Sequence, residues 1–227
     1  MDPVLLRAIP FHANADALLR QAHVRPETED AERMRELIAE AEAIARPKGM
    51  YKISYVEERS EDAVVVDGIK LSSRVLSVNL GDARRIFPFV ATCGRELDAW
   101  ASGIDDLLES FWAGTIMEAA LAVAYDAVAK HLHEHLQPGS TATMNPGSLP
   151  DWPMSEQAQL FALLGDPLQA VGVELTDSFL MRPIKSVSGL HFPTESHFEN
   201  CQLCPREHCP GRRAPYDKDL FARQYLA

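Results

Sequence analysis

The chain has 227 residues and a formal net charge of −11, from 22 Lys and Arg against 33 Asp and Glu. With 46% hydrophobic and 24% charged residues it can bury a sizeable core, which excludes a disordered chain. The excess of acid excludes nucleic acid as a general partner, because acidic surfaces repel phosphate. The sequence has no run of 18 apolar residues and no secretory pattern at its start. We therefore expect no membrane span and a cytoplasmic protein with reduced thiols.

The N-terminal part of the sequence predicts one amphipathic helix followed by short strands. Thr28 precedes a long run of apolar residues at spacings of three and four, which is typical of a helix with one buried stripe. Over residues 51–80 apolar positions alternate with polar ones, which predicts two or three strands, the last at 75–80. The apolar run 86–91 predicts a further strand, in which Pro88 indicates an edge position or a bend.

The middle of the sequence is predicted to be mostly helical over residues 96–136. Its Ala-rich part, 113–136, is the longest predicted element and is expected to lie at the centre of the core. Three histidines, His131, His133 and His135, lie near its end. Alternate helical positions point in different directions, so these side chains cannot converge on one metal. They are interpreted as a last helical turn, where positive charge is favourable.

The C-terminal third begins with a loop-like stretch over 137–153. Ser155 is then predicted to cap a short helix, and the segments 172–181 and 186–192 have strand composition. Gly189 within the second strand indicates a bend or a close approach of another backbone. Helices and strands are mixed without a βαβ rhythm, which predicts an α+β fold with an antiparallel sheet and a long central helix.

Three of the four cysteines form a C-x2-C-x4-C pattern at Cys201, Cys204 and Cys209. Thiolates at this spacing can face one ion or cluster, and three of them make three quarters of a tetrahedral zinc or [4Fe–4S] site. The fourth cysteine, Cys93, is distant in sequence, and the fold would have to bring it close. The nitrogen alternatives for zinc are His208 and, with less strain, His197.

Iron–sulfur is the preferred interpretation of this pattern, with zinc as the alternative and no metal as a third reading. A disulfide is disfavoured in a reducing compartment. The spacing resembles the first three ligands of the cluster domain of corrinoid iron–sulfur proteins, although that family adds a fourth cysteine downstream. Arg206, Arg212 and Arg213 make this segment basic within an acidic chain, and their charge would offset that of a thiolate-bound cluster.

Two other segments carry a family pattern. Residues 143–164 combine a Pro-Gly loop with a helix that ends in Leu-Leu, and residues 172–192 fit the form LTxSxxMxPxxSVSGxxF. The positions that fit are Leu175, Thr176, Ser178, Met181, Pro183, Ser186, Val187, Ser188, Gly189 and Phe192. Together the two segments resemble the reactivation domain of cobalamin-dependent methionine synthase. The resemblance covers roughly a quarter of the chain.

This resemblance implies a domain that binds S-adenosylmethionine and docks on a cobalamin domain, where reductive methylation rescues cobalt from the inert Co(II) state. It implies a ligand site at Asn145, Gly147 and Ser148 and, by a looser alignment, at Asp126 on the long helix. The family's arginine and tyrosine of the Pro-Gly loop are replaced by Thr143 and Ser148. Loss of a charge-assisted contact costs about 1.5–3 kcal/mol, so these departures weigh against ordinary S-adenosylmethionine binding.

The sequence thus predicts a single activation-domain-like domain over 1–227, in which the usual helical tail is replaced by a cysteine-containing metal or cluster tail over 197–227. The favoured function is a reactivation factor that acts in trans on a corrinoid protein or methionine synthase. It would take an electron from a donor protein and reduce Co(II) cobalamin through the cluster. The alternative is a zinc-stapled corrinoid-protein binding module without redox chemistry.

No catalytic residue is predicted, because no P-loop, dinucleotide-binding, zincin or nucleophile-elbow pattern occurs. Whether the chain is itself an enzyme, as part of a methyltransferase system, stays open. The plainest reading is that SVSG at 186–189 is only a tight, half-buried strand and the Pro-Gly segment only a loop.

Overall fold

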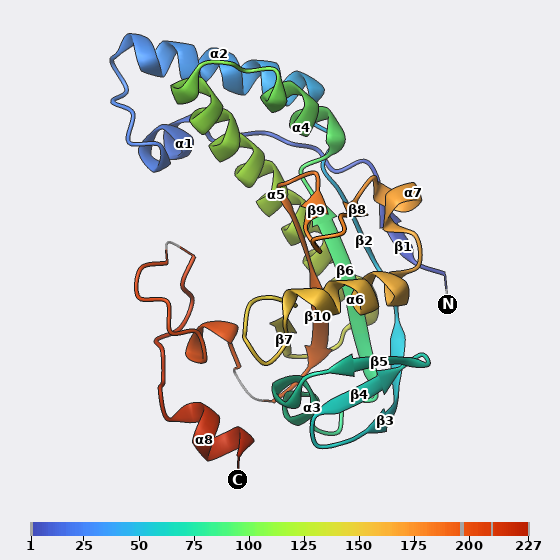
Figure 1. Cartoon of the computed structure of the whole chain (residues 1–227). Helices are drawn as coiled ribbons and strands as arrows, with labels where there is room; N and C mark the ends of the chain where they lie inside the picture. The colour runs from blue at the N-terminus through green and yellow to red at the C-terminus, as the bar shows by residue number, and fades with distance from the viewer. Residues whose placement is uncertain (1, 196–197, 210, 227) are drawn as a thin grey trace.

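The computed structural model describes residues 2–195, 198–209 and 211–226. Figure 1 shows a twisted sheet with a long helix running along one face and a group of helices beyond one of its ends. All strand pairs in the described residues are antiparallel, and helices and strands are mixed along the chain. The predicted α+β class, with an antiparallel sheet and a long helix, is therefore confirmed.

The main sheet has eight strands in the order β1-β2-β6-β3-β4-β5, with β10 on the other side of β6 and β7 beyond β10. Its strands are β1 (Val4–Leu6), β2 (Lys48–Tyr51), β3 (Ser54–Arg59), β4 (Ala63–Val66), β5 (Ile69–Ser72), β6 (Arg85–Thr92), β7 (Thr141–Met144) and β10 (Ser186–Pro193). A separate two-stranded hairpin consists of β8 (Glu174–Leu175) and β9 (Met181–Arg182).

The helices cover both faces and one end of this sheet. They are α1 (Ala15–Gln21), α2 (Glu29–Ile44), α3 (Arg74–Leu80), α4 (Arg95–Ser102), α5 (Leu107–Leu136), α6 (Gln157–Leu164), α7 (Pro167–Val171) and α8 (Leu220–Tyr225), with short 3-10 turns η1 (Met154–Glu156) and η2 (Asn200–Gln202). The predicted amphipathic helix is α2, which Thr28 caps by accepting a hydrogen bond from the Ala31 backbone. The predicted strand at 75–80 is instead helix α3.

Strand β6 is central in the sheet. Its side chains point alternately to the two faces and pack into two different apolar clusters. Phe87 and Phe89 pack against α5, whereas Ile86 and Val90 belong to a second cluster that includes α6. Pro88 therefore lies in an inner strand, and its prediction as an edge residue is wrong. Its carbonyl accepts from the Lys52 backbone, where the chain passes from β2 to β3, so the missing N–H falls in a gap of the ladder.

Helix α5 starts at Leu107, earlier than predicted, because the Asp106 side chain accepts from the backbone N–H groups of Leu108 and Glu109. By length and composition alone it is apolar enough to cross a membrane, with a mean hydropathy of 1.3 over an 18-residue window. The composition is equally that of a core helix, and here α5 buries residues both among the neighbouring helices and against β2 and β6.

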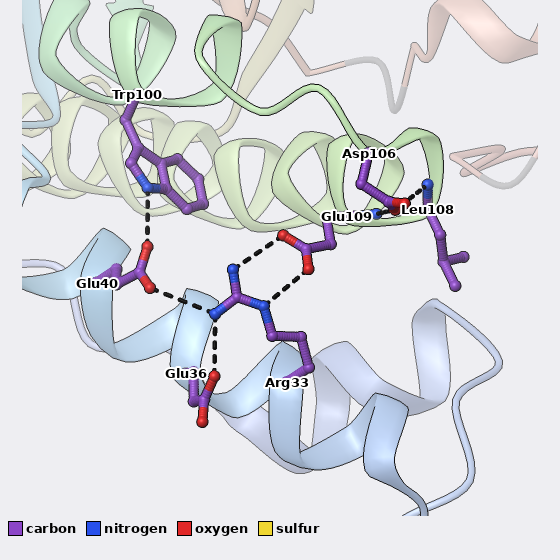
Figure 2. A network of polar contacts seen from close by, with 7 residues as sticks. All are labelled: Arg33, Glu36, Glu40, Trp100, Asp106, Leu108 and Glu109. Atoms are coloured by element: carbon purple, nitrogen blue, oxygen red, sulfur yellow. Dashed lines mark hydrogen bonds and ion pairs between the residues drawn. The ribbon is translucent and has the colours of Figure 1, made fainter.

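The helices α1, α2 and α4 pack with the first half of α5 as a helical lobe around their own apolar cluster. On the outer surface of the lobe one arginine links α2 to α5, as Figure 2 shows. The Arg33 guanidinium on α2 donates to both carboxylate oxygens of Glu109 on α5, at 2.8 and 2.9 Å, and to Glu36 at 2.9 Å. Glu40, 3.6 Å from Arg33, accepts from the Trp100 indole at 3.3 Å. The bidentate contact orients α2 against α5.

Candidate functional site

A cavity of about 730 Å³ opens where the segment 145–148, the start of α6, the β8–β9 hairpin and the first half of β10 meet. We call it the β10 cavity. Its walls combine hydroxyl and amide groups with apolar side chains, and residues from both family-like segments contribute to it. Such a mixture of convergent polar groups and apolar walls is typical of a small-molecule site.

The loop that follows β7 forms the first wall of the β10 cavity. The Ser148 backbone N–H donates to the Asn145 carbonyl at 3.1 Å, and the Gly147 N–H donates to the Trp152 carbonyl at 2.7 Å. Gly147 has φ +84°, and a Cβ there would lie 2.8 Å from the Met154 side chain. Glycine is therefore needed for the positive φ of this turn, which lies against the Met154 side chain of η1.

Asn145 ties this loop to β10. Its amide nitrogen donates to the Ser188 carbonyl at 2.8 Å, and its amide oxygen accepts from the Asn200 side chain at 3.3 Å. A Cβ on Gly189 would lie 2.5 Å from both the Asn145 amide and the Met144 carbonyl. The close backbone approach predicted at Gly189 is confirmed, and it brings the loop directly against the SVSG strand.

The floor of the β10 cavity is a buried hydroxyl–amide pair. The Ser188 hydroxyl donates to the Gln157 side-chain oxygen at 2.7 Å, and the two residues are 1% and 3% exposed. Nearby, the Ser186 hydroxyl contacts the Thr92 hydroxyl at 2.9 Å. These contacts fix the inward-facing polar atoms of β10 and α6 in one orientation, so the floor is preorganised.

The hairpin and the outer rim close the β10 cavity on the solvent side. Thr176 and Ser178 contact each other through their hydroxyls at 3.1 Å in the turn between β8 and β9. Leu180, Ile184 and Met154 are exposed around the opening, at 57%, 75% and 41%. The predicted strand over 172–181 is thus a short hairpin whose turn lines the site.

Of the four predicted ligand residues, the structure brings three together. Asn145, Gly147 and Ser148 all line the β10 cavity. Asp126 is exposed on α5 and is not among the lining residues. Sequence reasoning missed the contribution of Gln157 and of the matched serines and threonine of the second segment to the lining of this cavity. The signal was present in the family pattern, because most of its polar positions point into this cavity.

Thr143 stands where the related domain has its loop arginine, and its hydroxyl makes a different contact. The Thr143 hydroxyl lies 2.8 Å from Nδ1 of His191 on β10. His191 is 3% exposed, stacks on Phe89 with a centroid separation of 4.5 Å, and has no hydrogen-bond partner for Nε2 within the described residues. Burial, together with the positive charges of His133 and Arg213, lowers the pKa of His191 to about 4. The ring is therefore neutral at pH 7.

Cys93, predicted as a fourth metal ligand, follows β6 and is fully buried in the apolar cluster of the helical lobe. Burial, with Asp98 adding to it, raises the pKa of its thiol to about 12. Cys204, in the C-terminal segment, packs against the other large cluster. Figure 1 shows that segment well away from the end of β6, so the structure does not bring Cys93 to the other three cysteines.

The three remaining cysteines lie half-buried in a loop organised by one arginine. The Arg212 guanidinium donates to the carbonyl oxygens of Cys201 at 3.0 Å, Cys204 at 3.3 Å and Arg206. The backbone N–H of Arg213 lies 3.4 Å from the Cys201 sulfur. Through these contacts Arg212 holds the turns that carry the cysteines close to one another.

The metal predictions for this loop remain predictions. Among the residues that the structure describes, no group of three or more His, Cys, Asp or Glu side chains is placed to hold a metal ion. His208, one nitrogen alternative, is exposed. His197, the other alternative, lies outside the described residues, as does the start of the predicted metal tail.

Comparisons with known proteins agree with this description. Residues 143–208 match the family model of the vitamin B12 dependent methionine synthase activation domain. Thirteen chains of known structure match the fold. One is the crystal structure of the MetH reactivation domain bound to AdoHcy, with a TM-score of 0.57 and 19% identity, covering 88% of this chain and 81% of that chain. A search of the curated proteins finds no match. The structural likeness shows a shared fold, and the matched segment contains all the residues that line the β10 cavity.

Proposed function

We propose that this chain supports the reactivation of a corrinoid protein and that the β10 cavity binds a ligand of the S-adenosylmethionine class. The observation that carries the proposal is the position of the cavity: its loop, hairpin and β10 wall all fall within the segment that matches the activation-domain family. The structurally similar MetH domain is bound to AdoHcy, the demethylated form of such a ligand.

The chemistry supported by this proposal has two steps on the partner's cobalt. One electron from a low-potential donor protein would reduce Co(II) to Co(I), and the methyl group of the sulfonium would then pass to cobalt, leaving S-adenosylhomocysteine. For this chain the role is to hold the ligand and dock on the corrinoid partner. The buried Ser188–Gln157 pair offers fixed polar atoms for the ligand, and the exposed apolar rim at Leu180 and Ile184 offers surface for the partner.

Ligand binding by isothermal titration calorimetry tests the first part. S-adenosylhomocysteine is expected to bind the wild-type chain, and Ser188→Ala should weaken binding about tenfold, because it removes a buried hydroxyl and unpairs Gln157. Ser110→Ala, on the outer surface of α5, is the matched control and should bind like the wild type. Absence of any binding to the wild-type chain would contradict the ligand assignment.

The second part is tested on a corrinoid protein poised in the Co(II) state. With S-adenosylmethionine and a low-potential reductant present, addition of this chain should accelerate the appearance of methylcobalamin absorbance. The Ser188→Ala variant should be slower in proportion to its loss of ligand affinity. An unchanged rate with and without the wild-type chain counts against a role in reactivation.

A second candidate concerns the source of the electron. The cysteine loop at Cys201, Cys204 and Cys209 would hold an iron–sulfur cluster that passes an electron from a donor protein to the cobalt, or else a zinc ion that only staples the tail. The specific observation in its favour is the loop closure by Arg212: its guanidinium donates to the carbonyls of Cys201 and Cys204, and its backbone N–H donates to the Cys209 carbonyl at 3.1 Å. Metal binding would require the three thiols to turn toward one another.

Metal analysis of anaerobically purified protein decides between these forms. Stoichiometric iron with an electron paramagnetic resonance signal after reduction supports electron delivery, whereas stoichiometric zinc without iron supports the staple. Cys204→Ser should abolish either metal. Cys93→Ala should retain it, because Cys93 is buried in the lobe with a protonated thiol. A wild-type protein free of both metals contradicts both forms.

A further inference from the structure

One charged residue lines the β10 cavity among the residues that the structure describes. It is Arg182, at the end of the short strand β9. The other lining residues are uncharged, with hydroxyl and amide groups on the floor and apolar groups at the rim. Any anionic group on a bound ligand would therefore find one cation in this site.

The geometry of the hairpin leaves this guanidinium available. In the β8–β9 register Arg182 is directly opposite Glu174, the natural partner for a cross-strand ion pair. Glu174 instead lies 3.9 Å from Arg95, whose Nε also donates to the Gly172 carbonyl at 2.8 Å. Within the described part of the chain, the exposed Arg182 side chain has neither an ion pair nor a hydrogen bond.

An unpaired guanidinium beside hydroxyl-lined walls is suited to one class of ligand group. Its planar donors match the two oxygens of a carboxylate, and this bidentate arrangement adds direction as well as affinity. We propose that Arg182 is the specificity-determining residue of the β10 cavity and recognises the carboxylate of an amino-acid-bearing ligand. This inference rests on the proposed function, because it assigns the orientation of an S-adenosylmethionine-class ligand within the same cavity.

Two thioethers that share the nucleoside test this assignment by calorimetry. S-adenosylhomocysteine carries the amino-acid carboxylate, and 5′-methylthioadenosine lacks it. Arg182→Gln should weaken binding of the first about tenfold to a hundredfold and change the second less than about twofold. Arg182→Lys, which keeps the charge but not the fork, should recover only part of the loss. Arg25→Gln, an exposed arginine of the helical lobe, controls for net charge.

The outcomes separate the inference from the function beneath it. Equal affinity of the wild type and Arg182→Gln for S-adenosylhomocysteine overturns the role of Arg182 and leaves the ligand class intact. Equal losses for both thioethers also overturn it, because they indicate a general disturbance of the hairpin. If the wild type binds neither compound, the proposed ligand class and the inference fail together. Thermal unfolding of each variant shows whether the fold is retained.

Discussion

At the scale of single residues, His191 has the most sharply defined environment. Its ring is buried between Phe89 and Tyr125, its Nδ1 contacts Thr143, and its Nε2 has no partner in the described residues. The charged form would be unsolvated and close to other positive groups. This explains why the folded-state pKa, at about 4, lies below the ordinary value of 6.5.

The lowered pKa predicts a dependence of stability on pH. Above pH 6.5 the ring is neutral in both states; between 6.5 and about 4 only the unfolded chain takes the proton, so the free energy of unfolding falls as the pH falls. The total loss from this group is about 3 kcal/mol. In His191→Phe this loss should disappear, which urea unfolding at a series of pH values would measure. The exposed His208→Gln serves as the control, and equal slopes for His191→Phe and wild type between pH 6.5 and 5 would falsify the prediction.

At the scale of elements, the sequence predicted what is encoded locally. The helix α2 follows from its apolar spacing and its Thr28 cap, and the loop at Asn145 follows from the family pattern. Helix α3 was mistaken for a strand although Ser73 caps it locally, by accepting from the Leu76 backbone N–H at 2.9 Å, because a distant residue also holds its start. The Asp151 carboxylate contacts the Ser73 hydroxyl and accepts from the Val75 backbone at 2.9 Å, across 76 positions of sequence. No window of the sequence contains that contact.

The candidate site likewise has a part that the sequence predicted and a part that it did not. The residues of the cavity loop were found because they are adjacent in sequence, whereas the Ser188–Gln157 floor is formed by a helix and a strand that meet only in the fold. The placement of Cys93 was equally beyond a spacing argument, since spacing gives no information on which cluster a distant cysteine joins. Motifs of adjacent residues could be predicted from the sequence, whereas contacts between segments distant in sequence could not.

The cysteine turn and the cavity loop are joined by one side chain, Asn200 of η2. It is 7% exposed and donates to Asn145. Asn200→Ala should free both segments, so amide hydrogens of residues 145–152 and 198–204 should exchange about fivefold faster, as expected for one buried hydrogen bond. Glu207→Ala, on the exposed side of the same tail, should leave exchange unchanged. Faster exchange confined to the tail would show that the two segments are independent.

At the scale of the whole molecule, the C-terminal segment is part of the main core. Phe198 and Tyr225 belong to the cluster that also contains strand and α6 residues, and the Tyr225 hydroxyl donates to Asn79 of α3 at 2.8 Å. The described part of the segment predicted as a metal or cluster tail, 197–227, thus packs into this core. Its end packs against α3, and its cysteine loop is held between that contact and Asn200.

This packing predicts a large cost for removing one side chain near the end of the chain. Tyr225→Ala should lower the free energy of unfolding by about 3 kcal/mol or more, because it leaves a cavity and unpairs the buried Asn79. The exposed Tyr216→Ala should change it by less than about 0.5 kcal/mol. Chemical denaturation of the two variants measures the difference, and similar values for both would show that the tail contributes little to the fold.

Helix α5 has a mechanical consequence. Its 30 residues extend about 45 Å, and one half is embedded in the lobe while the other is packed under the sheet. A helix packed at both ends resists a sharp kink at its middle, because a kink would disrupt backbone hydrogen bonds. Force applied to the lobe by a docked protein would be transmitted along a stiff strut to β6, the strand beside the SVSG wall of the β10 cavity. The helical lobe and the β10 cavity would thus move together as one rigid unit.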